Sequence, residues 1–478
     1  MINNKPVVFY NVSYESITQY GEWMIKKMLW FFSLNCSEYI ILWRPHPTLK
    51  ERLFLLTDHS LYDKYSDLEK QFKNNKMGIF DNNKDIEWSI NVADIYYGDP
   101  GTVYNEFKIR NKKAILQNNT GLFFPMGINL YNEKDIYGID YGLSTIVKYN
   151  IENNAWSFCR EIPQKSLNEK TYHQCIQYKN KMIFSPFWTD ELMVYDTMSE
   201  EIFFYKLPLK DCLKSKQKSN FFQLLINDDI LYLMPAGYRA IMTFDLISNT
   251  FKEFINLSNY IGDNEFLSFS YCTKVDDKLF AVASISSNEV LIANYKTGEF
   301  TITSIGEKEY RFSNIVCYEG CIWLTVKLHK VIIKWKYETN EVTILNNFPD
   351  DFEGFGGNLF NDSATLIYKD KLYCIPAKSN MGIIVDTKTS EMINNEKISK
   401  YTNIPNKRIS VFDTHCHNEH TFFLQQQEFK FLIYDVKDDS ITESRCWMDK
   451  NECFLEEMAV IKDCVRQIVS DKNELYIK

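Results

Sequence analysis

The stretch Ala93–Phe107 reads Ala-Asp-Ile-Tyr-Tyr-Gly-Asp-Pro-Gly-Thr-Val-Tyr-Asn-Glu-Phe. It begins as a short apolar run, breaks at Gly98–Gly101, and resumes at Thr102 with apolar residues at helical spacing. This pattern predicts a strand, a tight loop and the start of a helix. Free backbone N–H groups at such a helix start favour a phosphate or another anion as ligand, although the same pattern describes any helix that follows a strand.

The first 120 residues alternate apolar runs with amphipathic stretches. The apolar runs predict five strands, at 7–10, 39–43, 77–80, 94–97 and 114–116. Apolar residues at helical spacing between these runs predict intervening helices. Buried strands that alternate with helices indicate a parallel sheet covered on both faces, and such sheets bind ligands at the carboxyl ends of their strands.

The second predicted strand ends in Arg44-Pro45-His46-Pro47, where two prolines hold Arg44 and His46 in extended backbone. The fourth ends at Gly98-Asp99, just before the predicted helix start. An arginine, a histidine and a helix start at one edge of a sheet predict a diphosphate site, whose residues are Arg44, His46, Gly98, Asp99, Gly101 and Thr102. Two alternatives remain open: His46 is an ordinary loop residue, and Arg44 pairs with Asp94 or Asp99.

These two motifs, Arg44–Pro47 and Ala93–Asp99 with the small residues after it, resemble the C-terminal nucleotide-binding lobe of the CDP-glycerol glycerophosphotransferase family. This family includes the teichoic-acid polymerases and has the GT-B architecture. The resemblance covers roughly residues 5–120. It implies that His46 binds the donor pyrophosphate, and that Gly101 and Thr102 stand where the family has two phosphate-binding serines. Glu106 matches an acidic position in the next helix and is a candidate for a ribose hydroxyl.

Two departures from the family pattern bear on activity. Gly101-Thr102 leaves one hydroxyl where the family has two. The family's acceptor lobe, with the histidine taken as catalytic base, has no counterpart here, and neither His46 nor His59 matches that base. The catalytic residues are therefore unassigned, and a base would have to come from another chain or from the rest of this one.

From about residue 121 the pattern changes to short strands and hairpin turns that repeat. The repeat contains a marker pair, usually an apolar or aromatic residue followed by Asp or Asn. The marker pairs are Tyr149-Asn150, Tyr195-Asp196, Phe244-Asp245, Ala293-Asn294, Trp335-Lys336, Val385-Asp386 and Tyr434-Asp435. Successive markers are 46, 49, 49, 42, 50 and 49 residues apart. This is the period of a four-stranded propeller blade, so seven markers predict a kelch-like, seven-bladed β-propeller, with a pair of β-sandwiches as the alternative.

Composition narrows the classes of partner. The formal net charge of −9 argues against nucleic acid as a general binding partner. The 12 cysteines contain no Cys-x-x-Cys pair, which suits buried free thiols in a reducing compartment.

No apolar run approaches the roughly 20 residues of a membrane span, and no signal peptide is visible. We therefore expect a cytoplasmic protein that is not integral to the membrane, either free or peripheral to its inner face.

One histidine cluster within Asp413–His420 invites a metal interpretation. His415 and His417 lie two residues apart on a predicted strand and share a face. Alignment of the repeats places both at positions where the other blades have packing residues, such as Ile176 and Tyr178. We therefore expect no metal site, and no cofactor is predicted.

Together, the sequence predicts a multidomain α/β plus all-β chain. Half of a GT-B fold, a Rossmann-like parallel sheet at 1–120, precedes a seven-bladed propeller at 121–478. Its expected role is glycerophosphotransferase-like, in the synthesis of a teichoic-acid-type cell-surface glycopolymer. The expected partners are CDP-glycerol or a related donor, and a separate acceptor-lobe protein or a glycan on the propeller. The alternative is a non-catalytic scaffold with a degenerate lobe, whose propeller binds a protein or glycan.

Overall fold

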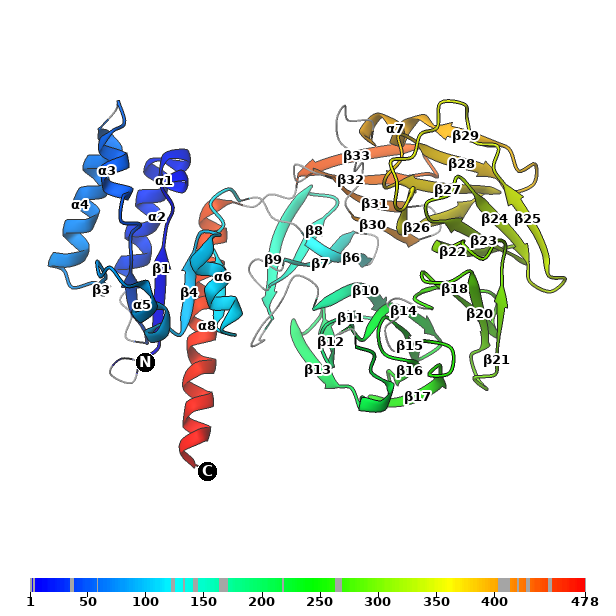
Figure 1. Cartoon of the computed structure of the whole chain (residues 1–478), viewed down its shortest axis with the longest axis horizontal. Coiled ribbons are helices and arrows are strands. Elements are labelled where there is room, and N and C mark those ends of the chain that lie inside the picture. The colour runs from blue at the N-terminus through cyan, green and yellow to red at the C-terminus, as the bar shows by residue number, and fades with distance from the viewer. Residues whose placement is uncertain are drawn as a thin grey trace.

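The computed structural model contains an α/β lobe and a ring of β-sheets (Figure 1). It describes the backbone except at residues 1, 3–4, 35–37, 58, 122–124, 132–133, 141–144, 163–170, 217–218, 263–268, 403–412, 419–420, 427–429, 446–448 and 478. Side chains are further left undescribed at residues 125–131, 161, 361–364, 402, 413–418, 421–426, 430–431, 445 and 471–477.

The lobe is built on a five-stranded parallel sheet in the order β3-β2-β1-β4-β5, which confirms the predicted α/β fold. The strands are β1 (Val7–Asn11), β2 (Ile40–Trp43), β3 (Ile79–Phe80), β4 (Ile95–Gly98) and β5 (Lys113–Leu116). The helices between them are α1 (Tyr14–Tyr20), α2 (Glu22–Ser33), α3 (Leu49–Phe54), α4 (Ser60–Asn74), α5 (Ile86–Val92) and α6 (Thr102–Ile109).

Strand β1 shows why these apolar runs form a buried sheet. Successive side chains of a strand point to opposite faces, so a run without polar residues requires cover on both sides. Val8 and Tyr10 pack into one core with helices α1 to α4. Val7 and Phe9 pack into a second core with α5 and α6. All four side chains are fully buried.

A helix from the far end of the chain completes the first of these cores. Helix α8 (Lys450–Ile477) buries Phe454, Met458, Ile461 and Val465 against the sheet and α2. These residues follow the three-and-four spacing that places side chains on one face of a helix. Helix α8 lies within the lobe beside β4 and β5 (Figure 1), on the face of the sheet opposite α6. The sequence-based division assigned everything after residue 121 to the propeller, whereas α8 packs with the lobe.

The ring contains seven four-stranded antiparallel sheets within the described part of the chain, which confirms the predicted seven-bladed propeller. Each blade uses four consecutive strands. Blades 1 to 4 are β6 (Pro125–Tyr131), β7 (Asp135–Asp140), β8 (Thr145–Asn150), β9 (Ala155–Glu161); β10 (Tyr172–Tyr178), β11 (Lys181–Pro186), β12 (Glu191–Asp196), β13 (Glu201–Lys206); β14 (Phe221–Asn227), β15 (Ile230–Pro235), β16 (Ala240–Asp245), β17 (Thr250–Asn256); and β18 (Tyr271–Lys274), β19 (Leu279–Ala283), β20 (Glu289–Asn294), β21 (Phe300–Ser304).

Blades 5 to 7 complete the ring. They are β22 (Phe312–Tyr318), β23 (Cys321–Val326), β24 (Ile332–Lys336), β25 (Glu341–Leu345); β26 (Phe360–Tyr368), β27 (Lys371–Pro376), β28 (Gly382–Asp386), β29 (Met392–Asn395); and β30 (Asp413–Asn418), β31 (Thr421–Gln426), β32 (Lys430–Asp435), β33 (Ser440–Arg445). A 3-10 helix at Asp211–Leu213 and helix α7 (Glu396–Thr402) lie between blades. The inner strand β30 contacts β6, so blade 7 meets blade 1 without exchanging a strand with it.

The repeated Asp or Asn of the sequence marker has a local structural role. The side chain of Asp245 accepts hydrogen bonds from the backbone N–H groups of Ile247 (2.8 Å) and Ser248 (2.9 Å). Asp196, Asn294 and Asp386 make the equivalent contacts in their own blades. Such contacts stabilise the turn between the third and fourth strands of a blade. The marker residue therefore recurs once per blade because each blade contains one such turn.

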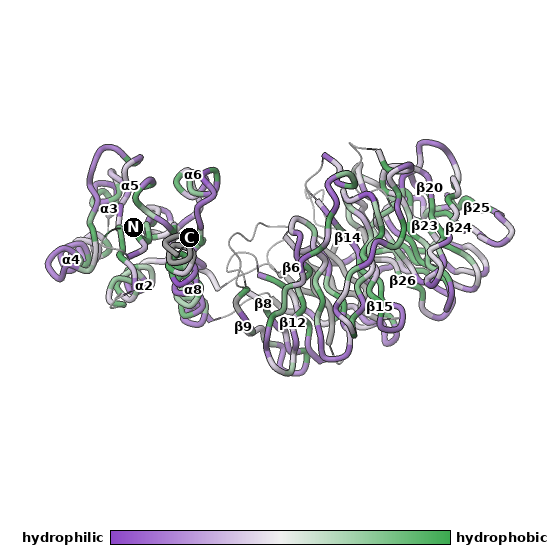
Figure 2. The backbone as a smooth tube through the Cα atoms, turned by 90° about the horizontal axis from the view of Figure 1, so that it is seen from below, coloured by the Kyte–Doolittle hydropathy of each residue, from purple (hydrophilic) through white to green (hydrophobic). Residues whose placement is uncertain are grey.

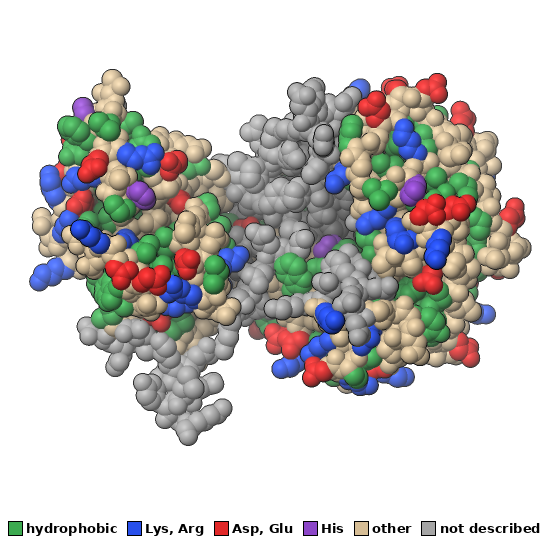
Figure 3. All heavy atoms as spheres, in the orientation of Figure 1, with side chains coloured by type: hydrophobic (Ala, Val, Ile, Leu, Met, Phe, Trp, Pro, Cys, Tyr) green, Lys and Arg blue, Asp and Glu red, His purple; other side chains and the backbone are tan. Residues whose placement is uncertain are grey.

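The surfaces of both parts are polar and mixed in charge. Figure 2 shows hydrophilic residues along α4 and at hairpin turns of the ring. Figure 3 shows acidic and basic side chains interspersed on one face of the lobe and the propeller. No helix in the described residues combines the length and apolar character needed to cross a lipid bilayer.

Candidate functional site: a crevice at the carboxyl edge of the lobe sheet

The order of the lobe strands creates a crevice between β1 and β4. The chain leaves β1 towards β2 on one side, whereas β4 leads to β5 on the other, so the loops after β1 and β4 diverge. Open α/β sheets bind ligands at this kind of reversal. A cavity of about 540 Å³ lies there, which we call the switch-point crevice. Its lining residues are Ser13, Glu15, Ser16, Gln19, Tyr20, Asp99, Pro100, Leu116, Gln117, Asn118, Asn119, Thr120 and Asp140.

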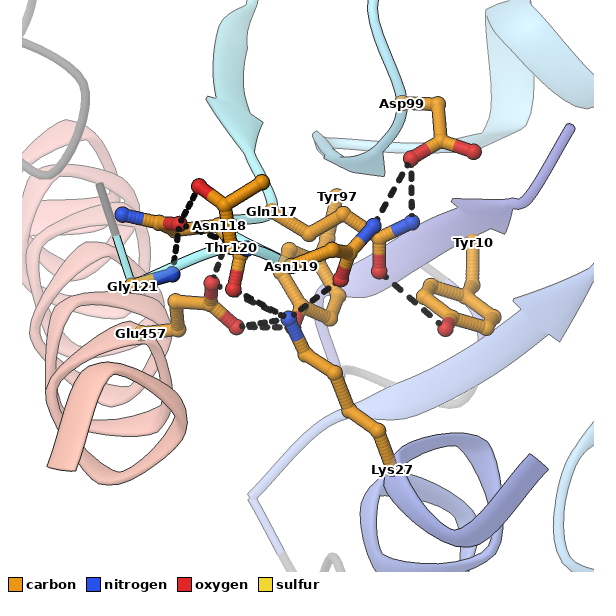
Figure 4. Close-up of polar contacts among 10 residues, drawn as sticks. All are labelled: Tyr10, Lys27, Tyr97, Asp99, Gln117, Asn118, Asn119, Thr120, Gly121 and Glu457. Atoms are coloured by element: carbon orange, nitrogen blue, oxygen red, sulfur yellow. Dashed lines mark hydrogen bonds and ion pairs between the residues drawn. The ribbon is translucent and has the colours of Figure 1, made fainter. Parts of the chain in front are cut away.

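Asp99 ties together the segments that form the crevice (Figure 4). One carboxylate oxygen accepts a hydrogen bond from the backbone N–H of Ser13, after β1, at 2.7 Å. The other accepts hydrogen bonds from the side-chain amides of Gln117 (2.6 Å) and Asn119 (3.3 Å), after β5. Asp99 is only 5% exposed. Both oxygens are therefore used to hold the crevice walls in place.

Gly98 allows the ends of β1 and β4 to approach closely enough for these contacts. A Cβ atom at residue 98 would lie 2.1 Å from the backbone oxygen of Asn11. That separation is far below any van der Waals contact, so a residue with a side chain would push the two strand ends apart.

A buried ion pair lies beneath the crevice. The ammonium group of Lys27, on α2, is 2.8 Å from the carboxylate of Glu457, on α8, and both side chains are fully buried. Lys27 also donates to the side-chain oxygen of Asn119 at 3.0 Å. Glu457 accepts hydrogen bonds from the Tyr97 hydroxyl and the Asn118 backbone N–H. Burial lowers the pKa of Lys27, and the Glu457 carboxylate opposes that shift. The floor of the crevice is thus assembled from both ends of the chain.

Arg44 has a structural partner that the sequence analysis did not name. Its guanidinium donates to the carboxylate of Asp81 (2.5 Å) and to the backbone oxygen of Asn83 (2.8 Å). A longer contact reaches the hydroxyl of Ser89 at 3.4 Å. Arg44 is 6% exposed. The group that was expected to bind a diphosphate is engaged with the loop between β3 and α5.

The other predicted residues lie outside the crevice lining. His46 is exposed, and its Nδ1 accepts a long hydrogen bond from the Thr48 backbone N–H at 3.3 Å. Helix α6 begins after Gly101 with Thr102, and no side chain caps its first N–H groups. Glu106 lies 3.5 Å from Arg110 in a partly exposed ion pair. Of the predicted set, only Asp99 lines the crevice.

Sequence reasoning overlooked the polar residues that follow β1 and β5. Ser13 and Ser16 come after β1, and Gln117 to Thr120 come directly after β5. Their signal was their position, because the carboxyl ends of parallel strands meet at one edge of a sheet. The predicted site drew only on the ends of the second and fourth strands.

The crevice is acidic. Glu15, Asp99 and Asp140 contribute carboxylates, and no lysine or arginine is among the described residues that line it. The remaining polar groups are hydroxyls and amides, and the ring of Tyr20 adds an apolar surface. Asp140 lies at the end of β7, so the first propeller blade also contributes to the wall.

His415 and His417, where no metal site was expected, lie on β30. The side chains of His415 and His417 fall outside the described residues. The expectation of no metal there therefore stays a prediction.

The sequence matches no family model and no curated protein. Solved structures similar to this chain include virginiamycin B lyase from Staphylococcus aureus, with a TM-score of 0.47 and 12% identity over 68% of this chain and 95% of that one. A streptogramin B lyase has a TM-score of 0.47 and 10% identity over 64% and 92% of the two chains. Apo AztD from Citrobacter koseri has a TM-score of 0.37 and 10% identity over 67% and 86%. All three TM-scores are below 0.5, and these likenesses carry no property over to this chain.

Proposed function

We propose that this chain is a non-catalytic binding protein whose switch-point crevice takes an uncharged, polyhydroxylated ligand such as a polyol or sugar. The observation that carries this proposal is the lining of the crevice. Carboxylates, amides and hydroxyls surround it without a described lysine or arginine. Vicinal hydroxyls both donate and accept hydrogen bonds, so they suit such a mixed set.

The charge of the crevice disfavours an anionic ligand. Glu15, which is paired with Arg52, and Asp140 both place carboxylates in the lining, and like charges at short range repel. Arg44 would have to leave Asp81 to compensate, and this would strand a buried carboxylate. A neutral ligand incurs neither cost.

The propeller is proposed to serve as a rigid platform that completes the crevice. Asp140 comes from its first blade, and the hydroxyl of Thr145, at the start of β8, donates to Glu456 of α8 at 2.9 Å. Cys453, near the start of α8, packs with Ile136 and Val147 of the same blade. The wall that blade 1 contributes is thus braced against the helix that completes the lobe.

Calorimetric titration with glycerol, ribitol and glucose tests this proposal. Saturable binding of one of these ligands is expected, with loss of binding in Ser16→Phe, which fills the crevice. Thr18→Ala is the matched control, because Thr18 lies on the same helix but not in the lining. Absence of binding by all three ligands, or equal binding by Ser16→Phe, would overturn the proposal.

A second candidate is a CDP-activated donor site of a glycerophosphotransferase-like protein in cell-surface glycopolymer synthesis. The uncapped start of α6, at Gly101 and Thr102, favours it because free N–H groups there suit a phosphate. The acceptor lobe would then belong to a separate protein, and the chain would work at the cytoplasmic face of the membrane. Micromolar binding of CDP-glycerol that is lost in His46→Ala would support this candidate over the first.

A further inference from the structure

A second cavity lies on the propeller, between blades 5 and 6. It has a volume of about 320 Å³, and we call it the interblade groove. Blade 5 contributes Trp323, Lys334, Lys336 and Thr343, and the β28–β29 hairpin of blade 6 contributes Thr387 and Lys388. Three lysines thus line one small cavity, together with the carboxylates of Glu319 and Glu341.

The groove coincides with a departure from the repeat. Six blades have Asp or Asn at the second marker position, where the side chain stabilises a turn; blade 5 has Lys336. Two residues earlier, blades 2, 3, 4, 6 and 7 have Val, Thr or Ile, whereas blade 5 has Lys334. Residues two apart on a strand share a face, so both lysines reach the groove. Places where a repeat abandons a favourable local choice are expected to be functional.

The lysines that line the groove make few contacts with other described residues. Lys334 donates to the backbone oxygen of Thr387 at 2.9 Å, and it lies 5.1 Å from the centre of the Trp323 ring. Among the described residues, the ammonium group of Lys336 has a long contact with Glu341, at 3.8 Å. The indole N–H of Trp323 is buried and has no hydrogen-bond acceptor among the described residues. An ammonium group carries three N–H donors, so Lys334 and Lys336 each retain donors beyond the contacts named here.

We propose that the interblade groove binds the phosphate group of a small phosphomonoester or free inorganic phosphate. Lysine ammonium groups bind phosphate as point charges, and phosphate offers several strong acceptors to their N–H groups. The hydroxyl of Thr343, which lies opposite Lys334 on the neighbouring strand, adds a further donor. Lys388 is held 2.6 Å from Asp370, which positions its ammonium group at the blade 6 wall. This proposal is independent of the crevice in the lobe.

Titration with inorganic phosphate and with glycerol 3-phosphate at constant ionic strength tests the proposal. Saturable binding of at least one is expected, and glycerol is the uncharged control. Tighter binding of glycerol 3-phosphate would identify a phosphomonoester as the ligand, and equal or tighter binding of inorganic phosphate would identify the free ion. Failure of both to bind would overturn the proposal.

The decisive variant is Lys336→Asp, because aspartate occupies the same marker position in four other blades and suits the turn. This variant should keep the thermal unfolding temperature of the unaltered protein while binding phosphate about tenfold more weakly, the loss expected for one charge-assisted contact. Lys148→Ala is the matched control, since Lys148 is the counterpart of Lys334 in blade 1. Unchanged affinity in a folded Lys336→Asp protein, or an equal loss in Lys148→Ala, would refute the site.

Discussion

The ammonium group of Lys27 and the carboxylate of Glu457, 430 residues apart in the chain, form a fully buried ion pair 2.8 Å long. This contact joins the second helix of the lobe to the last helix of the chain. Removing one partner leaves an uncompensated charge in the core.

Lys27→Met and Glu457→Leu should each lower the free energy of unfolding of the lobe by about 3–5 kcal/mol. The double variant should be less destabilised than the sum of the single variants, because it buries no unpaired charge. Part of the loss will persist, since Asn118 and Tyr97 lose their acceptor. The loss of stability in each variant can be measured by urea unfolding, with hydrogen exchange of peptides from β1 as the probe of the lobe. Strictly additive losses would contradict this account.

The packing of α8 into the lobe predicts contrasting effects along one helix. Ile461 is fully buried in the lobe core, whereas Leu455 is 66% exposed. Ile461→Ala should cost about 2–5 kcal/mol of lobe stability. Leu455→Ala, the control, should change it by less than about 0.5 kcal/mol. Chemical denaturation compares the two, and similar effects would show that α8 is not part of the lobe core.

The two glycines that flank Asp99 and Pro100 should respond differently to alanine. At Gly98 the added Cβ would meet the Asn11 backbone oxygen at 2.1 Å, whereas at Gly101 it would meet nothing within 4 Å. Gly98→Ala should therefore separate β1 from β4, lower the melting temperature and weaken any ligand bound in the crevice. Gly101→Ala should keep the melting temperature and the ligand affinity of the unaltered protein. Thermal unfolding and titration of the pair test this, and equal tolerance would argue against the close approach.

Asp81 should contribute to the acid sensitivity of the lobe. Its burial raises its pKa, but hydrogen bonds from Ser89, the Asn83 backbone and Arg44 outweigh that effect and lower it below the usual value. A carboxyl with a lowered pKa stabilises the folded state above its unfolded pKa, near 3.8, and loses that contribution as pH falls through the folded value. Below about pH 4, stability should therefore fall less steeply in Asp81→Asn than in the unaltered protein. Acid unfolding curves of Asp81→Asn and the unaltered protein test this, and parallel curves would contradict the prediction.

Much of the fold was predictable because its signals are local. The strands of the lobe are apolar runs that need cover on both faces, as Val7 to Tyr10 show. The blade period was visible because Asp196 and Asp245 each stabilise a turn only two or three residues away. In both cases the residues that form the sequence pattern also make the contacts that stabilise the local structure.

The less predictable features depend on contacts between distant residues. The spacing of Phe454 and Ile461 is visible in the sequence, but nothing local indicates that their partner is a sheet more than 300 residues earlier. Arg44 could have paired with several aspartates. Only the folded chain selects Asp81, because the loop after β3 returns beside the end of β2.

The packing of α8 also has a consequence for biosynthesis. The lobe lacks one wall of its core until Lys450 and the residues after it leave the ribosome, after roughly 330 further residues beyond Gly121. At typical rates of about 5–20 residues per second, this takes roughly 15–65 s. During that interval, the propeller blades can form in succession while the nascent lobe exposes apolar surface that α8 later covers. The core of the newly made lobe is thus completed only after α8 has been synthesised.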